Sequence, residues 1–302
     1  MKINHNGRIN IILQDKTVQR PYDKKGTSGS VNKHFREIEE AFSTFVAIDK
    51  IKTTIKQVYA SIIINEKRSE LGITANQQVL HMLFKGNPGT GKTTVARKLA
   101  KLYYDLGLLS KGHFIEVERA DLVGEYIGQT AQKTRSVIQK AMGGILFIDE
   151  AYSLARGGEK DFGKEAIDTL VKHMEDCQND FVLILAGYPR EMQRFLMTNP
   201  GLESRFPFIL DFADYKLDEL MEIAKGMVSD REYRLSQEAE TKLKIHLQKN
   251  ISMQNMNFSN ARNVRNLIEK AIRMHAYRLV QTQNYKLENL IELSAEDIIF
   301  EE

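Results

Sequence analysis

The sequence has 302 residues and is 42% hydrophobic, which is enough to bury one large core and leaves room for a second, smaller unit. A net charge of +3 is too small to require a nucleic-acid partner. The single cysteine, Cys177, excludes an internal disulfide and suits a reducing compartment, and no apolar stretch reaches the length of a membrane span. We therefore expect a cytoplasmic protein without a membrane span.

Residues 1–36 form a basic segment, with eight lysines and arginines against Asp15 and Asp23. We interpret this segment as a flexible leader; contact with an acidic partner is the alternative. Apolar residues at helical spacing then predict a short helix over 31–41 and a second helix from Ile51 to Ile62.

The stretch from Gly86 to Thr93 has the pattern G-x-x-x-x-G-K-[ST], which is the phosphate-binding P-loop. An apolar strand precedes it and a helical pattern follows it, which is the context that the motif needs. Backbone N–H groups and the positive helix end would bind phosphate, Lys92 would reach the β- and γ-phosphates, and the Thr93 hydroxyl would bind Mg²⁺. The predicted ATP-binding set is Gly86, Asn87, Pro88, Gly89, Thr90, Gly91, Lys92, Thr93 and Thr94.

Four apolar strands alternate with helical segments after residue 80, and a fifth strand follows. They are predicted at 81–84, 113–118, 144–148, 181–186 and 208–212. This alternation predicts an α/β domain with a parallel five-stranded sheet flanked by helices, over residues 37–212. From Leu217 onward the spacing is helical, so residues 213–302 are predicted to form a small helical domain.

The third of these strands ends in Asp149 and Glu150. A hydrophobic strand that ends in two acidic residues, after a P-loop, is the Walker B arrangement. Asp149 would lie beside the Mg²⁺ ion, and Glu150 would polarise the attacking water. Both groups project from the carboxyl end of the sheet, where ligands bind. Glu150 favours hydrolysis over binding alone.

Five stretches taken together resemble an AAA+ ATPase: GNPGTGKT, GGILFIDEAYSL, LILAGYPREM, NPGLESRFP and NARNVRN. More narrowly, they are similar to the group that contains the red-type Rubisco activases and the sporulation proteins of stage V, with the sporulation branch nearer. The resemblance covers about residues 37 to 300. It implies a P-loop NTPase fold with a helical lid, ATP and Mg²⁺ as cofactors, and a role in sporulation.

The resemblance gives further residues a role in the ATP site. Val46 and Ile48 match the segment that packs against adenine, although Ala47 stands where the family has glycine. Tyr188 occupies the sensor position after the fourth strand, where the family has a polar residue; a packed loop tyrosine is the alternative.

Two arginine positions are implied by the same resemblance. Arg205 matches the arginine finger that a neighbouring subunit supplies in trans, where a guanidinium would stabilise charge in the transition state; a surface ion pair at a helix end is the alternative. Arg262 matches the second sensor on the lid, with Arg265 as the alternative.

An arginine finger and a lid imply a homo-oligomer, and the family expectation is a hexamer. The segment Tyr126-Ile127-Gly128 then resembles the pore loop, which would bind a protein client through stacking and apolar contact; a loop tyrosine packed on its own domain is the alternative. We expect an ATP-driven protein-remodelling motor. The alternatives are a nucleic-acid-handling ATPase such as a helicase loader, which the basic leader suggests but no nucleic-acid-binding motif supports, and a P-loop small-molecule kinase.

Overall fold

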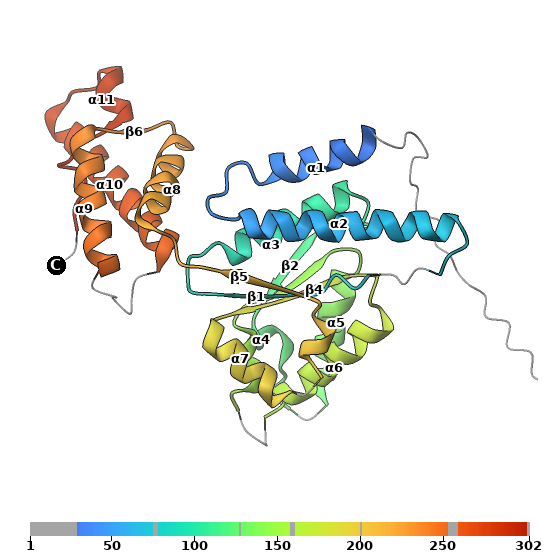
Figure 1. Cartoon of the computed structure of the whole chain (residues 1–302). Helices are drawn as coiled ribbons and strands as arrows, with labels where there is room; N and C mark the ends of the chain where they lie inside the picture. Colours follow the sequence, from blue (N-terminus) through green and yellow to red (C-terminus); the bar gives the residue numbers. More distant parts are fainter. Residues whose placement is uncertain are drawn as a thin grey trace, which may run out of the picture.

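The computed structural model describes residues 29–74, 78–126, 128–157, 161–199, 201–252 and 259–300. A parallel sheet lies between two layers of helices, and a separate group of helices formed by the end of the chain lies to one side of it (Figure 1). Among the described residues, no helix is both long enough and apolar enough to cross a membrane.

The layer above the sheet in Figure 1 contains α1 (Gly29–Ala41), α2 (Asp49–Glu70) and α3 (Lys92–Asp105). The layer below contains α4 (Arg119–Leu122), α5 (Gln129–Ala141), α6 (Gly163–Asp176) and α7 (Pro189–Thr198). Two short 3₁₀ turns complete the domain: η1 (Ala151–Ala155) follows strand β3 (Ile145–Ile148), and η2 (Glu203–Arg205) precedes strand β5 (Phe208–Phe212).

The strands of the sheet are β1 (Met82–Gly86), β2 (Phe114–Val117), β3 (Ile145–Ile148), β4 (Val182–Gly187) and β5 (Phe208–Phe212). Their order is β2-β3-β4-β1-β5, and every pair is parallel. The chain leaves β1 for the far edge at β2 and then returns strand by strand to β4. A crevice therefore opens at the carboxyl ends of β1 and β4, where strand order reverses and where such sheets bind ligands.

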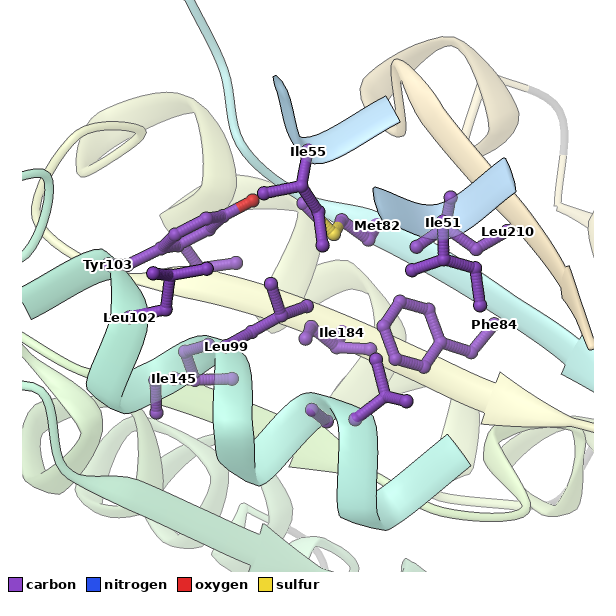
Figure 2. Packing of buried hydrophobic residues seen from close by; sticks show 14 of the residues in the cluster. Ile51, Ile55, Met82, Phe84, Leu99, Leu102, Tyr103, Ile145, Ile184 and Leu210 are labelled. Carbon is purple, nitrogen blue, oxygen red and sulfur yellow. The ribbon is translucent and has the colours of Figure 1, made fainter. Parts of the chain in front are cut away.

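Successive residues of the central strands β1, β3 and β4 enter different cores, because side chains alternate across a strand. Met82 and Phe84 of β1 lie among residues of α2 and α3 (Figure 2) in a core that α1 also joins, whereas Leu83 packs with α5, α6 and α7. Burial on both faces explains why the strands are apolar throughout rather than alternating. The predicted parallel five-stranded sheet is confirmed.

The C-terminal part of the chain has its own core. It is built from α8 (Leu217–Ser229), α9 (Gln237–Ser252), α10 (Asn260–Thr282) and α11 (Leu287–Ile291), with short paired strands β6 (Arg234–Leu235) and β7 (Glu292–Leu293). Asp297 is buried and forms two hydrogen bonds of 2.8 Å with Arg278 of α10, which fixes the chain end to this group of helices. We call residues 216–300 the lid. The prediction of a helical lid is confirmed.

The predicted leader falls largely outside the described residues, since residues 1–28 are not among them. Helix α1 begins at Gly29 and continues without a break past residue 36, where the leader was predicted to end. Phe35 packs against the core above the sheet, so the last residues of that segment belong to the folded domain.

Candidate functional site

A cleft of about 510 Å³ lies at the carboxyl end of the sheet, between the P-loop and the start of α10. It brings together residues that are far apart in the sequence. Its lining includes Lys92, Thr93, Thr94, Asp149, Glu150, Tyr188, Arg262 and Arg265.

The P-loop owes its shape to glycines at three positions. Gly89 and Gly91 have φ values of 72° and 93°, a region that residues with a Cβ atom adopt only under strain. Gly86 lies against β5, where a Cβ atom would come within 2.6 Å of Phe212. Helix α3 therefore begins directly after this turn, at Lys92. The first N–H groups of a helix have no partner within the helix and can bind an anion.

Lys92 is buried at the base of this loop. Its ammonium group donates hydrogen bonds to the carbonyl oxygens of Gly86 at 2.7 Å and Asn87 at 2.9 Å. Burial lowers the pKa of Lys92; Asp149 opposes this effect and Arg262 adds to it. The amine is held inside the loop, where phosphate oxygens would replace the two carbonyl groups as its partners.

Asp149 and Glu150 follow β3 directly and face the same cleft. The Asp149 carboxylate accepts a hydrogen bond of 2.9 Å from the Glu150 N–H. Glu150 has a φ of 45°, an unusual conformation for a residue with a side chain, and such strain concentrates at functional sites. The hydroxyl of Thr93 and the carboxylate of Asp149 line the same cleft, and this set of oxygen atoms suits Mg²⁺.

Tyr188 and Arg262 line the cleft from two different elements, since Tyr188 follows β4 and Arg262 lies on α10. The ring centre of Tyr188 is 5.9 Å from the Lys92 amine. Burial raises the pKa of Tyr188, an effect that Glu150 strengthens and Arg262 weakens. Arg262 thus acts electrostatically on both Lys92 and Tyr188, while Arg265 lines the cleft beside it.

Arg205 does not line the cleft that contains the P-loop. It ends η2, before β5, and instead lines a second cavity of about 340 Å³ that includes Glu175 and His81. Its guanidinium group donates to the Glu175 carboxylate through Nε at 3.0 Å and also through Nη2, and Nη1 donates to the Gly201 carbonyl. All three guanidinium nitrogens therefore have acceptors on its own subunit, and Glu175 orients the side chain.

The predicted pore loop joins α4 to α5. Tyr126 is 67% exposed, and Gly128, immediately before α5, has a φ of 82°; Ile127 lies outside the described residues. The stem of the loop is fixed, since buried Thr130 accepts from the Gly124 N–H at 2.9 Å and buried Thr134 donates to the Leu122 carbonyl at 3.1 Å. An exposed aromatic side chain is thus carried on an anchored stem.

The segment predicted to contact adenine lies between α1 and α2. Ile48 is buried in the core above the sheet, and Val46 is partly buried. Neither is part of the cleft lining given above. Ala47 has a φ of 58°, the left-handed conformation that explains why a glycine is the expected residue here.

Three residues that the sequence analysis did not select connect the lid to the P-loop: Asp214, Tyr215 and Asn260. Asn87 donates to Asp214 across 127 positions of sequence, and no local pattern signals such a contact. The lysine, threonine, acidic and lid arginine residues selected from the sequence do meet in one cleft.

Comparisons with known proteins agree with this architecture. A model of the ATPase family associated with various cellular activities (AAA) matches residues 82–213, and an AAA lid domain model matches residues 216–302. The chain is 55% identical to stage V sporulation protein K of Bacillus subtilis over 307 residues, which cover 99% of this chain and 95% of that protein. It is 44% identical to the chloroplastic ribulose bisphosphate carboxylase/oxygenase activase of Cyanidioschyzon merolae, over 84% of this chain and 87% of that protein.

Among solved structures, the AAA domain of FIGL-1 in complex with ADP superposes with a TM-score of 0.57, over 92% of this chain and 90% of that one. Its sequence identity is 14%, so this likeness concerns the fold alone.

Proposed function

We propose that this chain, which belongs to the AAA family of ATPases and hydrolyses ATP, uses the hydrolysis to remodel a protein client. The proposal has three parts: the role of each residue in the ATP site, the sharing of that site between subunits, and the grip on the client.

Within one subunit, the P-loop amides and Lys92 would hold the phosphates. Thr93 and Asp149 would hold Mg²⁺, which when bound neutralises charge that develops on the phosphate oxygens. Glu150 would accept the proton of the attacking water. Its carboxylate faces the cleft, and its backbone is fixed by the hydrogen bond to Asp149.

Tyr188 and Arg262 would sense the γ-phosphate from two different elements that line the cleft. We assign the second sensor to Arg262 rather than Arg265, because Arg262 lies directly against the P-loop, where a Cβ atom on Gly89 would come within 2.8 Å of its backbone nitrogen. The Arg262 charge also acts on the pKa of both Lys92 and Tyr188. Val46 and Ile48 would contribute the adenine side of the site through the segment before α2.

The site would be completed by a neighbouring subunit in a homo-oligomer, which we expect to be a hexamer. Arg205 supports this, since its guanidinium group pairs with Glu175 instead of lining the cleft of its own subunit. A guanidinium group oriented in this way could reach the γ-phosphate of an adjacent copy.

The observation that carries the remodelling proposal is the exposed ring of Tyr126 on an anchored loop. A tyrosine in water at a loop tip contributes little to folding, whereas its ring can stack on the side chains and backbone of an extended polypeptide. Tyr126, with Ile127 and Gly128, would form the pore loop of the ring.

The experiment uses fluorescein-labelled casein as an unfolded polypeptide, in the Glu150→Gln background that retains ATP. We expect ATP-dependent binding of casein that Tyr126→Ala abolishes and Tyr126→Phe preserves. Tyr104→Ala is the matched control, because Tyr104 on α3 is also exposed, at 52%. Equal casein binding by the Tyr126→Ala and Tyr104→Ala proteins would refute the proposal that the Tyr126 ring binds the client, whatever their ATPase rates.

The cellular setting is proposed from the relatives. A 55% identical protein is named for stage V of sporulation, so we propose that this motor works in sporulation. The single cysteine suits the cytoplasm. We propose that the nucleotide-binding domain begins with α1 at Gly29 instead of at residue 37, that it ends near residue 212 and that the lid follows it. The leader, predicted at 1–36, is then limited to the residues before α1 and stays a candidate contact for an acidic partner.

A further inference from the structure

The outer side of the P-loop is held by the lid and by the segment that leads into it. Three consecutive carbonyl groups of the loop accept hydrogen bonds from these parts of the chain. Pro88 accepts from the Asn260 side chain at 3.2 Å, Gly89 from the Ala261 N–H at 3.1 Å, and Thr90 from the Tyr215 hydroxyl at 3.1 Å.

Asn260 is the centre of this contact. Its side chain is 1% exposed, and its Nδ2 donates to Asp214 at 2.8 Å as well as to Pro88. Its Oδ1 accepts from the Tyr215 N–H at 3.0 Å. The Asp214 carboxylate also accepts from the Asn87 side chain, at 2.8 and 3.0 Å. The two donor hydrogens and the acceptor of Asn260 are therefore all used, and only one orientation of the amide satisfies these partners.

The backbone of Asn260 is matched to this position. Its φ is 47°, a left-handed conformation that asparagine tolerates better than most residues. The approach is also close, since a Cβ atom on Gly89 would lie 2.0 Å from the Ser259 carbonyl oxygen and 2.8 Å from the Arg262 nitrogen. The lid and the P-loop thus meet backbone to backbone.

This contact has a consequence for phosphate binding. In a trans peptide, the C=O of one residue and the N–H of the next point in opposite directions. When the carbonyls of Pro88, Gly89 and Thr90 are held toward the lid, the N–H groups of residues 89 to 91 point to the other side of the loop. Amide groups that are already fixed before a ligand arrives lose no conformational freedom when the ligand binds, so binding costs less entropy.

We infer that Asn260 is a positioning residue for the nucleotide: through Asp214 and the P-loop carbonyls, it orients the phosphate-binding amides and couples nucleotide affinity to the seating of the lid. Asn260 touches the loop from outside, so it acts through the P-loop and not on the phosphates. The inference rests on the proposed position of the phosphates in the P-loop, and it is independent of the pore loop and the client.

The test measures the dissociation constant of the fluorescent nucleotide mant-ADP with the full chain. Asn260→Gly keeps the left-handed backbone accessible and removes the side chain. Gln283→Gly is the matched control, because Gln283 follows the opposite end of α10 with a φ of 51°. We expect Asn260→Gly to weaken mant-ADP about tenfold and Gln283→Gly to leave the affinity unchanged.

A second readout distinguishes positioning from general destabilisation. Without nucleotide, hydrogen–deuterium exchange of a peptide covering residues 86–93 should be faster in Asn260→Gly than in Gln283→Gly, while the core strand β3 stays equally protected in both. The milder variant Tyr215→Phe removes only the hydroxyl on Thr90 and should weaken mant-ADP by about threefold. It keeps the inference testable if Asn260→Gly fails to fold.

Two results would overturn the inference. The first is a mant-ADP affinity of Asn260→Gly within twofold of the wild type; if Asn260→Gly does not fold, the same result for Tyr215→Phe counts instead. The second is a loss of affinity in Gln283→Gly equal to that in Asn260→Gly. Lys92→Ala separates this failure from failure of the proposed site. If Lys92→Ala also binds mant-ADP normally, the phosphates do not lie in the P-loop; if it loses binding while Asn260→Gly does not, only the role of Asn260 is wrong.

Discussion

Replacing His81 by asparagine should change how the stability of the protein depends on pH. His81 precedes β1, its side chain is fully buried, and its Nδ1 accepts a hydrogen bond of 3.0 Å from the Leu183 N–H on β4. Burial lowers the pKa of His81 from 6.5 to about 4, against a smaller opposing contribution from the Met174 backbone. Protonation would place a hydrogen on Nδ1, where the Leu183 N–H already points, and would bury a charge.

The direction of this pH dependence follows from proton binding at His81 in the folded and unfolded states. Between pH values of about 4 and 6.5, the unfolded chain binds a proton at His81 and the folded chain does not, so stability falls as the pH falls. From these two pKa values, the loss is about 1.4 kcal/mol at a pH of about 5.5 and about 2.6 kcal/mol at a pH of about 4.5. At a pH of about 7.5 the loss is close to zero.

The assay is urea unfolding followed by far-UV circular dichroism, on the wild type and His81→Asn at each pH. Asparagine retains an acceptor near the position of Nδ1 and does not titrate. The difference in unfolding free energy between the two proteins should therefore shift in favour of His81→Asn by these amounts as the pH falls, and the titrations of other groups cancel. If the difference in unfolding free energy between the wild type and His81→Asn stays constant down to a pH of about 4.5, the lowered pKa of buried His81 is contradicted.

Three further predictions concern the ATP site and its supports. Glu150→Gln should keep mant-ADP affinity and lower ATP turnover by about 10² or more, because the water loses its base; a turnover near that of the wild type would exclude this role. Arg205→Ala should lower turnover by about 10³, and mixing this protein with Glu150→Gln should restore part of the activity, because mixed assemblies contain some sites with both groups; no recovery on mixing would argue against action in trans. Ala47→Gly should raise the unfolding free energy by up to about 1 kcal/mol, since it relieves the left-handed alanine, while Ala60→Gly inside α2 should lower it by a similar amount; thermal unfolding measures both.

Much of the ATP site could be predicted from the sequence because its parts are local. The P-loop is eight consecutive residues, and its glycines, lysine and threonine have fixed mutual positions once a strand enters and a helix leaves. Asp149 and Glu150, about 60 residues after the P-loop, could be assigned to the same site, because the carboxyl ends of parallel strands share one edge of the sheet. The family resemblance extended this to Arg262, which does line the cleft.

The strand order was not accessible in the same way. Strands that are buried on both faces are apolar throughout, so their sequences do not show which residue faces which helical layer or which strands are neighbours. The order β2-β3-β4-β1-β5 depends on where the crossing helices pack. The helix predicted over residues 31–41 is present as α1, but its place in the folded domain depends on contacts that Phe35 makes with the distant core.

The sequence by itself thus determined a triphosphate site with hydrolytic chemistry on a parallel sheet, because motif spacing and strand ends encode it locally. Only the tertiary structure decided how that site is supported. The Asn260–Asp214–Asn87 contact joins three segments, and the Glu175–Arg205 pair joins α6 to η2. Burial lowers the pKa of His81, and its Nδ1 accepts from the Leu183 N–H on the neighbouring strand. Each depends on the relative placement of elements far apart in the chain, and hydrogen bonds between such elements leave no periodic trace in the sequence.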